Sequence, residues 1–202
     1  MTILTMYPTS INEKYMELVI NTLRDGGIII YPTDSLYAIG CNALNNQAIE
    51  RICRIKGINP AKTNLSIICH DISQSAEYAR IDNRAFRIMK DNLPGPFTFL
   101  LPASTTLPKV FKGRKTVGVR IPDNAIAREI AMRMDSPLLT TSIQWDTEDE
   151  AINPESIAMR YSDTVDIVID GGEGGTEPST VIDITDSSNP EIIRQGLGEI
   201  EL

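Results

Sequence analysis

The stretch GGIIIYPTDSLYAIGC at residues 26–41 decides the fold. Its first half has the apolar composition of a buried strand, and that strand stops at Pro32. Three small polar residues follow at 33–35, and apolar residues return at once with Leu36 and Tyr37. A surface turn explains the proline and the aspartate, because both favour turns, but it does not explain this immediate return. The sequence therefore predicts a core strand followed by a polar turn with a further role.

Helices and strands alternate on either side of this stretch. Upstream, Ser10 and Glu13 have the spacing of a capping box, and apolar residues at helical spacing follow as far as Gly26. Further helices are predicted over 46–57 and 124–134, after caps at Ser73 and Asp82, and from Pro154, which follows a cap at Asn153. Further strands are predicted at 65–69, within 94–101, and at 116–120, 137–142, 165–170, 179–184 and 191–196.

This alternation predicts an α/β protein with a parallel or mixed sheet. The last strands follow one another without helices between them, so part of the sheet is expected to be antiparallel. The acidic run at 145–150 is predicted to be a solvated loop. With 202 residues and no linker, repeat or break, the chain is expected to form one domain over residues 1–202.

Composition excludes several classes of protein. The net charge of −8 argues against nucleic acid binding over the whole surface and leaves only a local basic patch, such as the loop KGRK at 112–115. No apolar run is long enough for a membrane span and no signal peptide is visible, so a cytoplasmic location is expected. Three cysteines and one histidine, His70, do not make a zinc site or a catalytic triad, so no metal ligands are assigned and the cysteines are expected to be reduced core thiols.

Several predicted strands end or begin on hydroxyl or arginine side chains. The residues are Thr33, Asp34 and Ser35, then Arg120, then Thr140, Thr141 and Ser142, then Ser179 and Thr180, and Arg194. Ligands of open α/β sheets lie beyond strand ends, and arginine binds carboxylate or phosphate with two parallel hydrogen bonds. Ordinary turn chemistry explains the hydroxyls equally well, but it gives the two arginines no role. No P-loop occurs, and GGEGG at 171–175 is predicted to be a flexible turn.

Taken together, the motifs resemble the YrdC-like family. YPTDSLYAIGC, Lys56, PGPFTFLL, VGVRIP, TTS, DGG, PSTVID and IIRQG come in the family's order between about Gly26 and Gly196. The resemblance implies a twisted mixed sheet flanked by helices around a large, concave, positively lined cavity. It implies the activity of a threonylcarbamoyl-AMP synthase, a nucleotidyltransferase that joins L-threonine, bicarbonate and ATP, with Mg²⁺ accompanying the ATP, for a tRNA modification. It also implies double-stranded RNA or tRNA as a partner of the basic cavity.

The resemblance further implies a role for individual residues. Thr33, Arg120, Thr140 and Ser179 would bind L-threonine, with Arg120 on its carboxylate. Lys56, Ser142 and Arg194 would bind the nucleotide. No side chain is assigned as catalytic, because the reaction needs positioned substrates and positive charge rather than a protein nucleophile. In this interpretation residues 32–35 form an inward-facing cavity floor, with Tyr37 and Gly40 packed beneath it.

Two positions depart from the synthase pattern. Ile58 stands where synthases carry the arginine of Lys-x-Arg, and Gln144 stands where they carry the asparagine of Ser-x-Asn. Both departures, together with AIERICRI at 48–55 and AFRIMKDN at 85–92, are similar to the YciO-like subgroup. The resemblance therefore leaves three alternatives: a slow synthase, a nucleotide- or RNA-binding protein without turnover, and an enzyme of the same fold that accepts another amino acid or carbamate.

Overall fold

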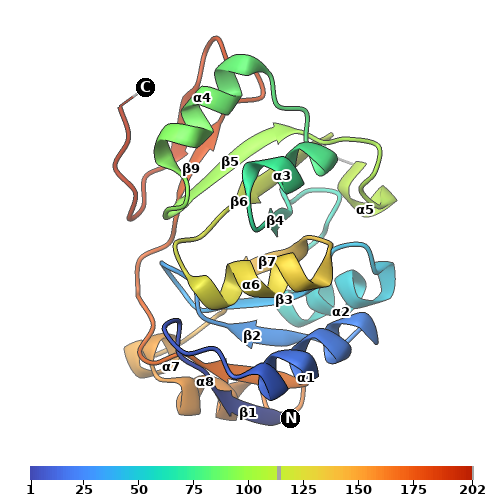
Figure 1. The fold of residues 1–202 in the computed structure, drawn as a ribbon, viewed down its shortest axis with the longest axis vertical. Helices are drawn as coiled ribbons and strands as arrows, with labels where there is room; N and C mark the ends of the chain where they lie inside the picture. The colour runs from blue at the N-terminus through green and yellow to red at the C-terminus, as the bar shows by residue number, and fades with distance from the viewer. Residues whose placement is uncertain (113–114, 202) are drawn as a thin grey trace.

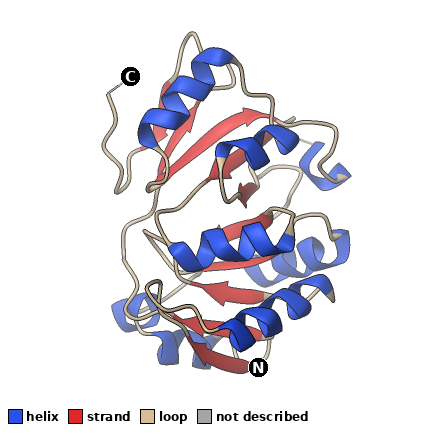
Figure 2. Ribbon diagram, viewed as in Figure 1, coloured by secondary structure: helices blue, strands red, loops and turns tan. Residues whose placement is uncertain are grey.

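The structure is a computed structural model that describes residues 1–112 and 115–201, so Gly113 and Arg114 of the basic loop lie outside it. Ten strands form a single mixed sheet in the order β1-β8-β2-β3-β7-β4-β6-β5-β9-β10 (Figure 2). The strands are β1 (Thr2–Thr5), β2 (Ile29–Tyr31), β3 (Ala38–Asn42), β4 (Ser66–Ile68), β5 (Phe97–Pro102), β6 (Thr116–Arg120), β7 (Leu138–Ser142), β8 (Ile167–Asp170), β9 (Thr180–Asp183) and β10 (Glu191–Arg194).

Helices connect and cover these strands (Figure 1). They are α1 (Glu13–Arg24), α2 (Asn46–Lys56), α3 (Ile72–Tyr78), α4 (Asn83–Asn92), α5 (Lys109–Lys112), α6 (Ala125–Met134), α7 (Glu148–Ile152) and α8 (Pro154–Arg160). The connection from β8 to β9 climbs one side of the molecule, because these strands lie near opposite ends of the sheet (Figure 1). One edge of the sheet therefore pairs segments distant in sequence, β1 with β8, and the other pairs the consecutive strands β9 and β10.

One face of the sheet carries the larger apolar core. Paired residues follow one another across six strands on this face and are buried: Cys41, Leu139, Ile67, Val119, Phe99 and Ile182. Apolar side chains of α2, α3, α4 and α8 pack against them. This face is continuous because each strand presents an apolar residue at every second position.

The opposite face is covered over only part of its width. Apolar side chains of α1 and α6 pack there against β1, β8, β2 and the near ends of β7 and β4. Beyond this second core the same face carries small or polar residues in register: Thr140, Ser66 and Gly118 lie side by side on β7, β4 and β6. Small polar side chains offer little apolar surface for a helix to pack against. This half of the face is therefore left uncovered and forms a cavity.

Most predicted elements are present, and the differences have local causes. Asn12, not Ser10, caps α1, and Asp71, not Ser73, caps α3, because in each case the side-chain oxygen accepts the amide three residues on. Strand β1 was not predicted, and the acidic run at 145–150, expected to be a loop, includes the start of α7, whose cap is Thr147.

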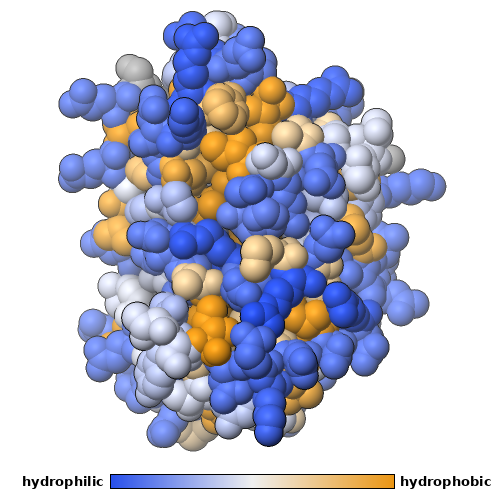
Figure 3. All heavy atoms as spheres, in the orientation of Figure 1, coloured by the Kyte–Doolittle hydropathy of each residue, from blue (hydrophilic) through white to orange (hydrophobic). Residues whose placement is uncertain are grey.

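The surface viewed in Figure 1 is hydrophilic over most of its area, with apolar patches in its upper part near α3 and α4 (Figure 3). No helix in residues 1–112 or 115–201 is long and apolar enough to cross a membrane. The three cysteines are buried and form no disulfide.

Candidate functional site

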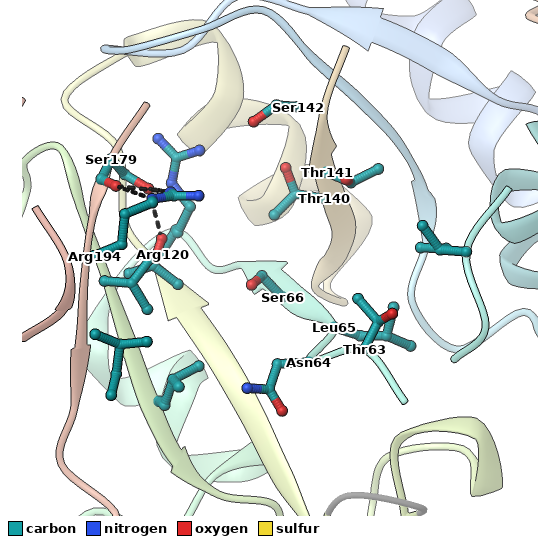
Figure 4. Close-up of a pocket in the computed structure, with 15 residues that line it drawn as sticks. Thr63, Asn64, Leu65, Ser66, Arg120, Thr140, Thr141, Ser142, Ser179 and Arg194 are labelled. Atoms are coloured by element: carbon teal, nitrogen blue, oxygen red, sulfur yellow. Dashed lines mark hydrogen bonds between the residues drawn. The ribbon is translucent and has the colours of Figure 1, made fainter. Parts of the chain in front are cut away.

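A cavity of about 220 Å³ opens on the uncovered half of the sheet. Figure 4 shows Arg120, Arg194 and Ser179 on one side of it, with Thr140, Thr141 and Ser142 across from them. Its lining comes from six neighbouring strands and their ends: Thr63, Asn64, Leu65, Ser66, Thr98, Leu100, Arg120, Thr140, Thr141, Ser142, Ser179, Val181, Ile193 and Arg194, with Ile58 after α2.

The depth of the cavity depends on Gly118. A Cβ added at this position would lie 2.3 Å from the Ser66 hydroxyl oxygen and 3.0 Å from a methyl carbon of Thr98. Ser66 and Thr98 both line the cavity, so a side chain on Gly118 would fill space between them. The glycine in VGVR is therefore explained by a close approach of neighbouring strands.

Arg120 lies at the end of β6 with only 6% of its surface exposed. Its Nη2 donates to Asp34 Oδ1 at 3.2 Å and to Ser35 Oγ at 2.9 Å. Burial lowers the pKa of the guanidinium, and the Asp34 carboxylate acts against this change. Nε of Arg120 is buried and has no hydrogen-bond partner in the described part of the chain.

The PTDS turn supplies the acceptors for Arg120. Asp34 is fixed from its other oxygen, which accepts the Asp123 amide at 2.7 Å. The Thr33 hydroxyl donates to the Leu36 carbonyl at 2.6 Å and accepts the Ser35 amide at 3.1 Å. Thr33 does not line the cavity, so in this structure its hydroxyl stabilises the turn. The turn contacts Arg120 through Asp34 and Ser35, but none of residues 32–35 is among the lining residues, so the predicted cavity floor is formed by other residues.

The loop at 171–175 packs directly on this turn. The Gly175 amide donates to the Ser35 carbonyl at 3.0 Å, and the Tyr37 hydroxyl bridges the Gly172 carbonyl and the Gly171 amide at 2.7 and 3.0 Å. A Cβ on Gly175 would lie 2.3 Å from the Ser35 carbonyl oxygen. The glycines therefore permit close packing, which differs from the flexible turn expected from the sequence.

Hydroxyl groups on the cavity wall are oriented by buried partners. The Tyr31 hydroxyl donates to Thr140 Oγ1 at 2.9 Å, and burial raises the pKa of Tyr31, so the phenol stays protonated. Thr98 and Ser179 share a hydrogen bond of 2.8 Å. Thr140, Ser179 and Arg120, three of the four residues predicted for L-threonine, thus line one cavity.

Arg194 reaches the same cavity from β10. Its Nε and Nη2 both donate to the Ser179 carbonyl, at 3.2 and 2.8 Å. Burial lowers the pKa of Arg194. No carboxylate in the described residues lies within ion-pair distance of Arg194. Its guanidinium donates hydrogen bonds to the neutral oxygen atoms of Ser179 instead.

Lys56 lies behind the cavity wall rather than in it. Its Nζ donates to the carbonyl of Ser142, and burial lowers the pKa of the ammonium. Of the three residues predicted for the nucleotide, Ser142 and Arg194 line the cavity and Lys56 does not. Lys56 therefore contacts the cavity wall only through the backbone of Ser142, among the contacts of the described residues.

The two departures from the synthase pattern differ in position. Ile58 lines the cavity and also packs against the larger core, so an apolar side chain replaces a charge at this wall. Gln144 is exposed and lies outside the cavity lining, and its backbone is held by the Tyr161 hydroxyl at 2.7 Å. Only the first departure changes the cavity surface.

Sequence reasoning missed several residues of the site. Tyr31, which orients Thr140, was not singled out, and neither were Ser66 and Thr98, whose hydroxyls lie in apolar strands. Asp34 and Ser35 were placed among the strand-end residues, but their contact with Arg120 was not predicted. A polar residue at an alternate position of an apolar strand was the signal for Ser66 and Thr98. Nothing in the sequence joined Asp34 to Arg120, because that contact spans 86 residues.

These features define a class: a mixed α/β protein whose sheet holds a cavity lined by two arginines and several hydroxyl groups. A family model for Sua5, YciO and YrdC, described as telomere recombination, matches residues 21–196, and the chain belongs to this family. The chain is 38% identical to an uncharacterized protein, YciO of Escherichia coli K12, over 97% of its own length and 96% of YciO. It is 33% identical to the threonylcarbamoyl-AMP synthase of Pyrococcus abyssi, covering 60% of that longer protein.

Solved structures agree with this assignment. The crystal structure of Escherichia coli YciO superposes with a TM-score of 0.90 at 37% identity, covering 98% of each chain. The crystal structure of Pyrococcus abyssi Sua5 complexed with L-threonine superposes with a TM-score of 0.87 at 30% identity, over 97% of this chain and 58% of Sua5. The mixed, helix-flanked sheet predicted from the sequence is confirmed by both matches.

Proposed function

We propose that the cavity binds L-threonine and ATP side by side and that the chain forms L-threonylcarbamoyl-AMP from L-threonine, bicarbonate and ATP. The observation that carries this proposal is that Arg120 and Arg194 line one cavity together with hydroxyl groups. Arg120 binds the threonine carboxylate, with Thr140 and Ser179 beside it. Arg194 and Ser142 bind the nucleotide, and the charge of Lys56 supports the phosphates. The relatives named as threonylcarbamoyl-AMP synthases support the same assignment.

The chemistry requires no protein nucleophile. The threonine amine attacks the carbon derived from bicarbonate and gives a carbamate, with loss of water. A carbamate oxygen then attacks the α-phosphorus of ATP, the bond to the β-phosphate oxygen breaks, and pyrophosphate leaves. Mg²⁺ enters with ATP as its counterion. The protein contributes positioning and positive charge opposite the phosphates, which are the terms that the two arginines supply.

Ile58 limits this reaction, because the cavity wall lacks one positive charge there. We expect Ile58→Arg to strengthen ATP binding about tenfold and to increase pyrophosphate release in the presence of L-threonine and bicarbonate. The matched control is Gln144→Asn, which restores the other synthase residue outside the cavity and leaves ATP affinity within about twofold. Calorimetry and a coupled pyrophosphate assay measure both effects. No pyrophosphate above background with either protein would exclude the synthase reaction.

Binding without turnover is the second candidate, and Ile58 on the cavity wall favours it. In that case ATP binds, L-threonine strengthens its binding, and no pyrophosphate forms. The tRNA or double-stranded RNA partner remains a prediction of the family resemblance, and the net charge of −8 argues for a weak contact. RNA affinity that does not fall between low and physiological salt would exclude contacts with phosphates.

A further inference from the structure

The two arginines of the cavity differ in their counter-charges. Arg120 is paired with Asp34, and the two side chains are only 7% and 9% exposed. Arg194 has neutral partners, the carbonyl and hydroxyl of Ser179 at 2.8 and 3.5 Å. Both arginines line the same cavity, so one ligand there can contact both of them. The cavity therefore has a neutralised end and a positive end.

We infer that Asp34 is a specificity-determining residue, which neutralises Arg120 so that phosphate groups bind at the Arg194 end and leave Arg120 to a zwitterionic ligand. This inference rests on the proposed function. A zwitterion has no net charge, so the Asp34 carboxylate changes its binding little. A polyanion such as pyrophosphate is attracted by Arg120 and repelled by Asp34, so the pair attracts it less than Arg120 alone would. Asp34 thus weakens the binding of a polyanion at Arg120 more than it weakens the binding of a zwitterion.

The geometry keeps the Asp34 charge in place. One carboxylate oxygen accepts from Arg120 and the other accepts the Asp123 amide, so Asp34 cannot turn away when a ligand enters. Nη2 of Arg120 already donates to two acceptors, Asp34 and Ser35. A ligand carboxylate therefore meets the remaining donors, of which the buried Nε has no partner in the described part of the chain.

The test is calorimetric titration of inorganic pyrophosphate into the wild-type protein and into Asp34→Asn at low salt. Asparagine keeps an acceptor oxygen and removes the charge. We expect Asp34→Asn to bind pyrophosphate about tenfold more tightly than the wild type, because one opposing charge in a buried site is lost. A structural defect would weaken binding, so a gain in affinity cannot come from misfolding. Equal affinity in the two folded proteins would overturn the inference.

The matched control is Asp123→Asn. This carboxylate lies close in sequence to Arg120 but is exposed, where it pairs with Arg128 at 3.2 Å. Because an exposed charge is screened by solvent, we expect Asp123→Asn to change pyrophosphate affinity less than about twofold. An equal gain in both variants would mean that total charge, rather than Asp34, sets the affinity, and would overturn the inference.

A second measurement can overturn the inference with the wild-type protein alone. If phosphate binds at the Arg194 end, saturating L-threonine leaves pyrophosphate affinity within about twofold, whereas in Asp34→Asn the two ligands compete. Competition in the wild type would overturn the inference even if Asp34→Asn failed to fold. A wild-type protein that binds neither ligand would instead contradict the proposed function, so the two failures are distinguishable.

Discussion

At the scale of the residue, the Arg120–Asp34 pair couples stability to binding. Removing one member of a buried ion pair leaves the other charge without compensation. We expect Arg120→Met to lower the free energy of unfolding by about 3 kcal/mol and to abolish L-threonine binding. Urea unfolding and calorimetry measure the two effects.

The double variant separates charge from packing. Arg120→Met with Asp34→Asn removes both charges, so we expect it to recover part of the stability lost in Arg120→Met while L-threonine binding stays absent. A double variant as unstable as the sum of the two single variants would show that the pair does not couple the two positions.

The buried cysteines make the free energy of unfolding depend on pH in the alkaline range. Burial raises the pKa of Cys41 and of Cys69 from 9.0 to about 12. Above pH 9 the unfolded chain releases these protons while the folded chain retains them, so stability is lost as the pH rises from about 9 toward 12. Each thiol contributes a slope of about 1.4 kcal/mol per pH unit in that window. Urea unfolding, measured at intervals of roughly one pH unit from about pH 8 to about pH 11, tests the slope.

The control for this pH dependence is the variant Cys41→Ala with Cys69→Ala. Its unfolding free energy should fall less steeply above about pH 9, because Cys53 and the buried tyrosines, whose pKa values burial also raises, then remain. Identical slopes for the variant and the wild type would show that the thiols do not carry the effect.

At the scale of the element, local patterns in the sequence predicted much of the structure. Alternating apolar residues predicted the strand at 116–120 with its observed bounds, and the Asn153–Pro154 pair predicted the start of α8. The caps of α1 and α3 were misplaced because neighbouring Asn and Asp side chains compete with Ser for the same amides. Strand β1 has a short mixed pattern and is stabilised by pairing with β8, a contact that no local signal reports.

The loop at 171–175 is an element whose tight packing can be tested. We expect Gly175→Ala to cost about 1–3 kcal/mol and to weaken L-threonine binding, because its Cβ would push Ser35 away from Arg120. Thermal melting and calorimetry measure the two effects.

The matched control for this loop is Gly57→Ala. Gly57 has a φ of 61° with open space around its Cα, so this variant should cost about 1 kcal/mol through backbone strain alone. Unchanged L-threonine binding in Gly175→Ala would show that the loop does not position Ser35.

At the scale of the whole molecule, the two edges of the sheet should respond differently to ligands. Strand β10 is an edge strand with all four residues exposed, and two of them, Ile193 and Arg194, line the cavity. We expect its amides to exchange with solvent faster than those of β7 and to slow when ATP binds. Hydrogen exchange followed by mass spectrometry measures both rates.

The opposite edge strand, β1, is the internal control. It lies at the far end of the sheet from β10 and contributes nothing to the cavity, so ATP should leave its exchange unchanged. Equal slowing at both edges would indicate a general stabilisation instead of a contact at β10.

The candidate site could be predicted only in part at this scale. The hydroxyl and arginine residues at strand ends marked Arg120, Thr140, Ser142, Ser179 and Arg194, which the fold brings to one cavity. Thr33 and Lys56 do not line the cavity: the Thr33 hydroxyl bonds within its own turn, and Lys56 donates to the carbonyl of the lining residue Ser142. Which side chains reach the cavity depends on the pairing of strands that are distant in sequence. A single sequence does not reveal that pairing.

The order of strands also governs when the site can exist. Strands β1 and β2, which leave the ribosome early, are neighbours only through β8, and Arg194 belongs to the last strand of the sheet. A nascent chain therefore exposes unpaired strand edges until most of its length has been synthesised, and it cannot bind ligand before then. Such long-range pairing slows folding. Only a fully synthesised and folded chain can therefore bind ligand. Until then its exposed strand edges need protection by chaperones.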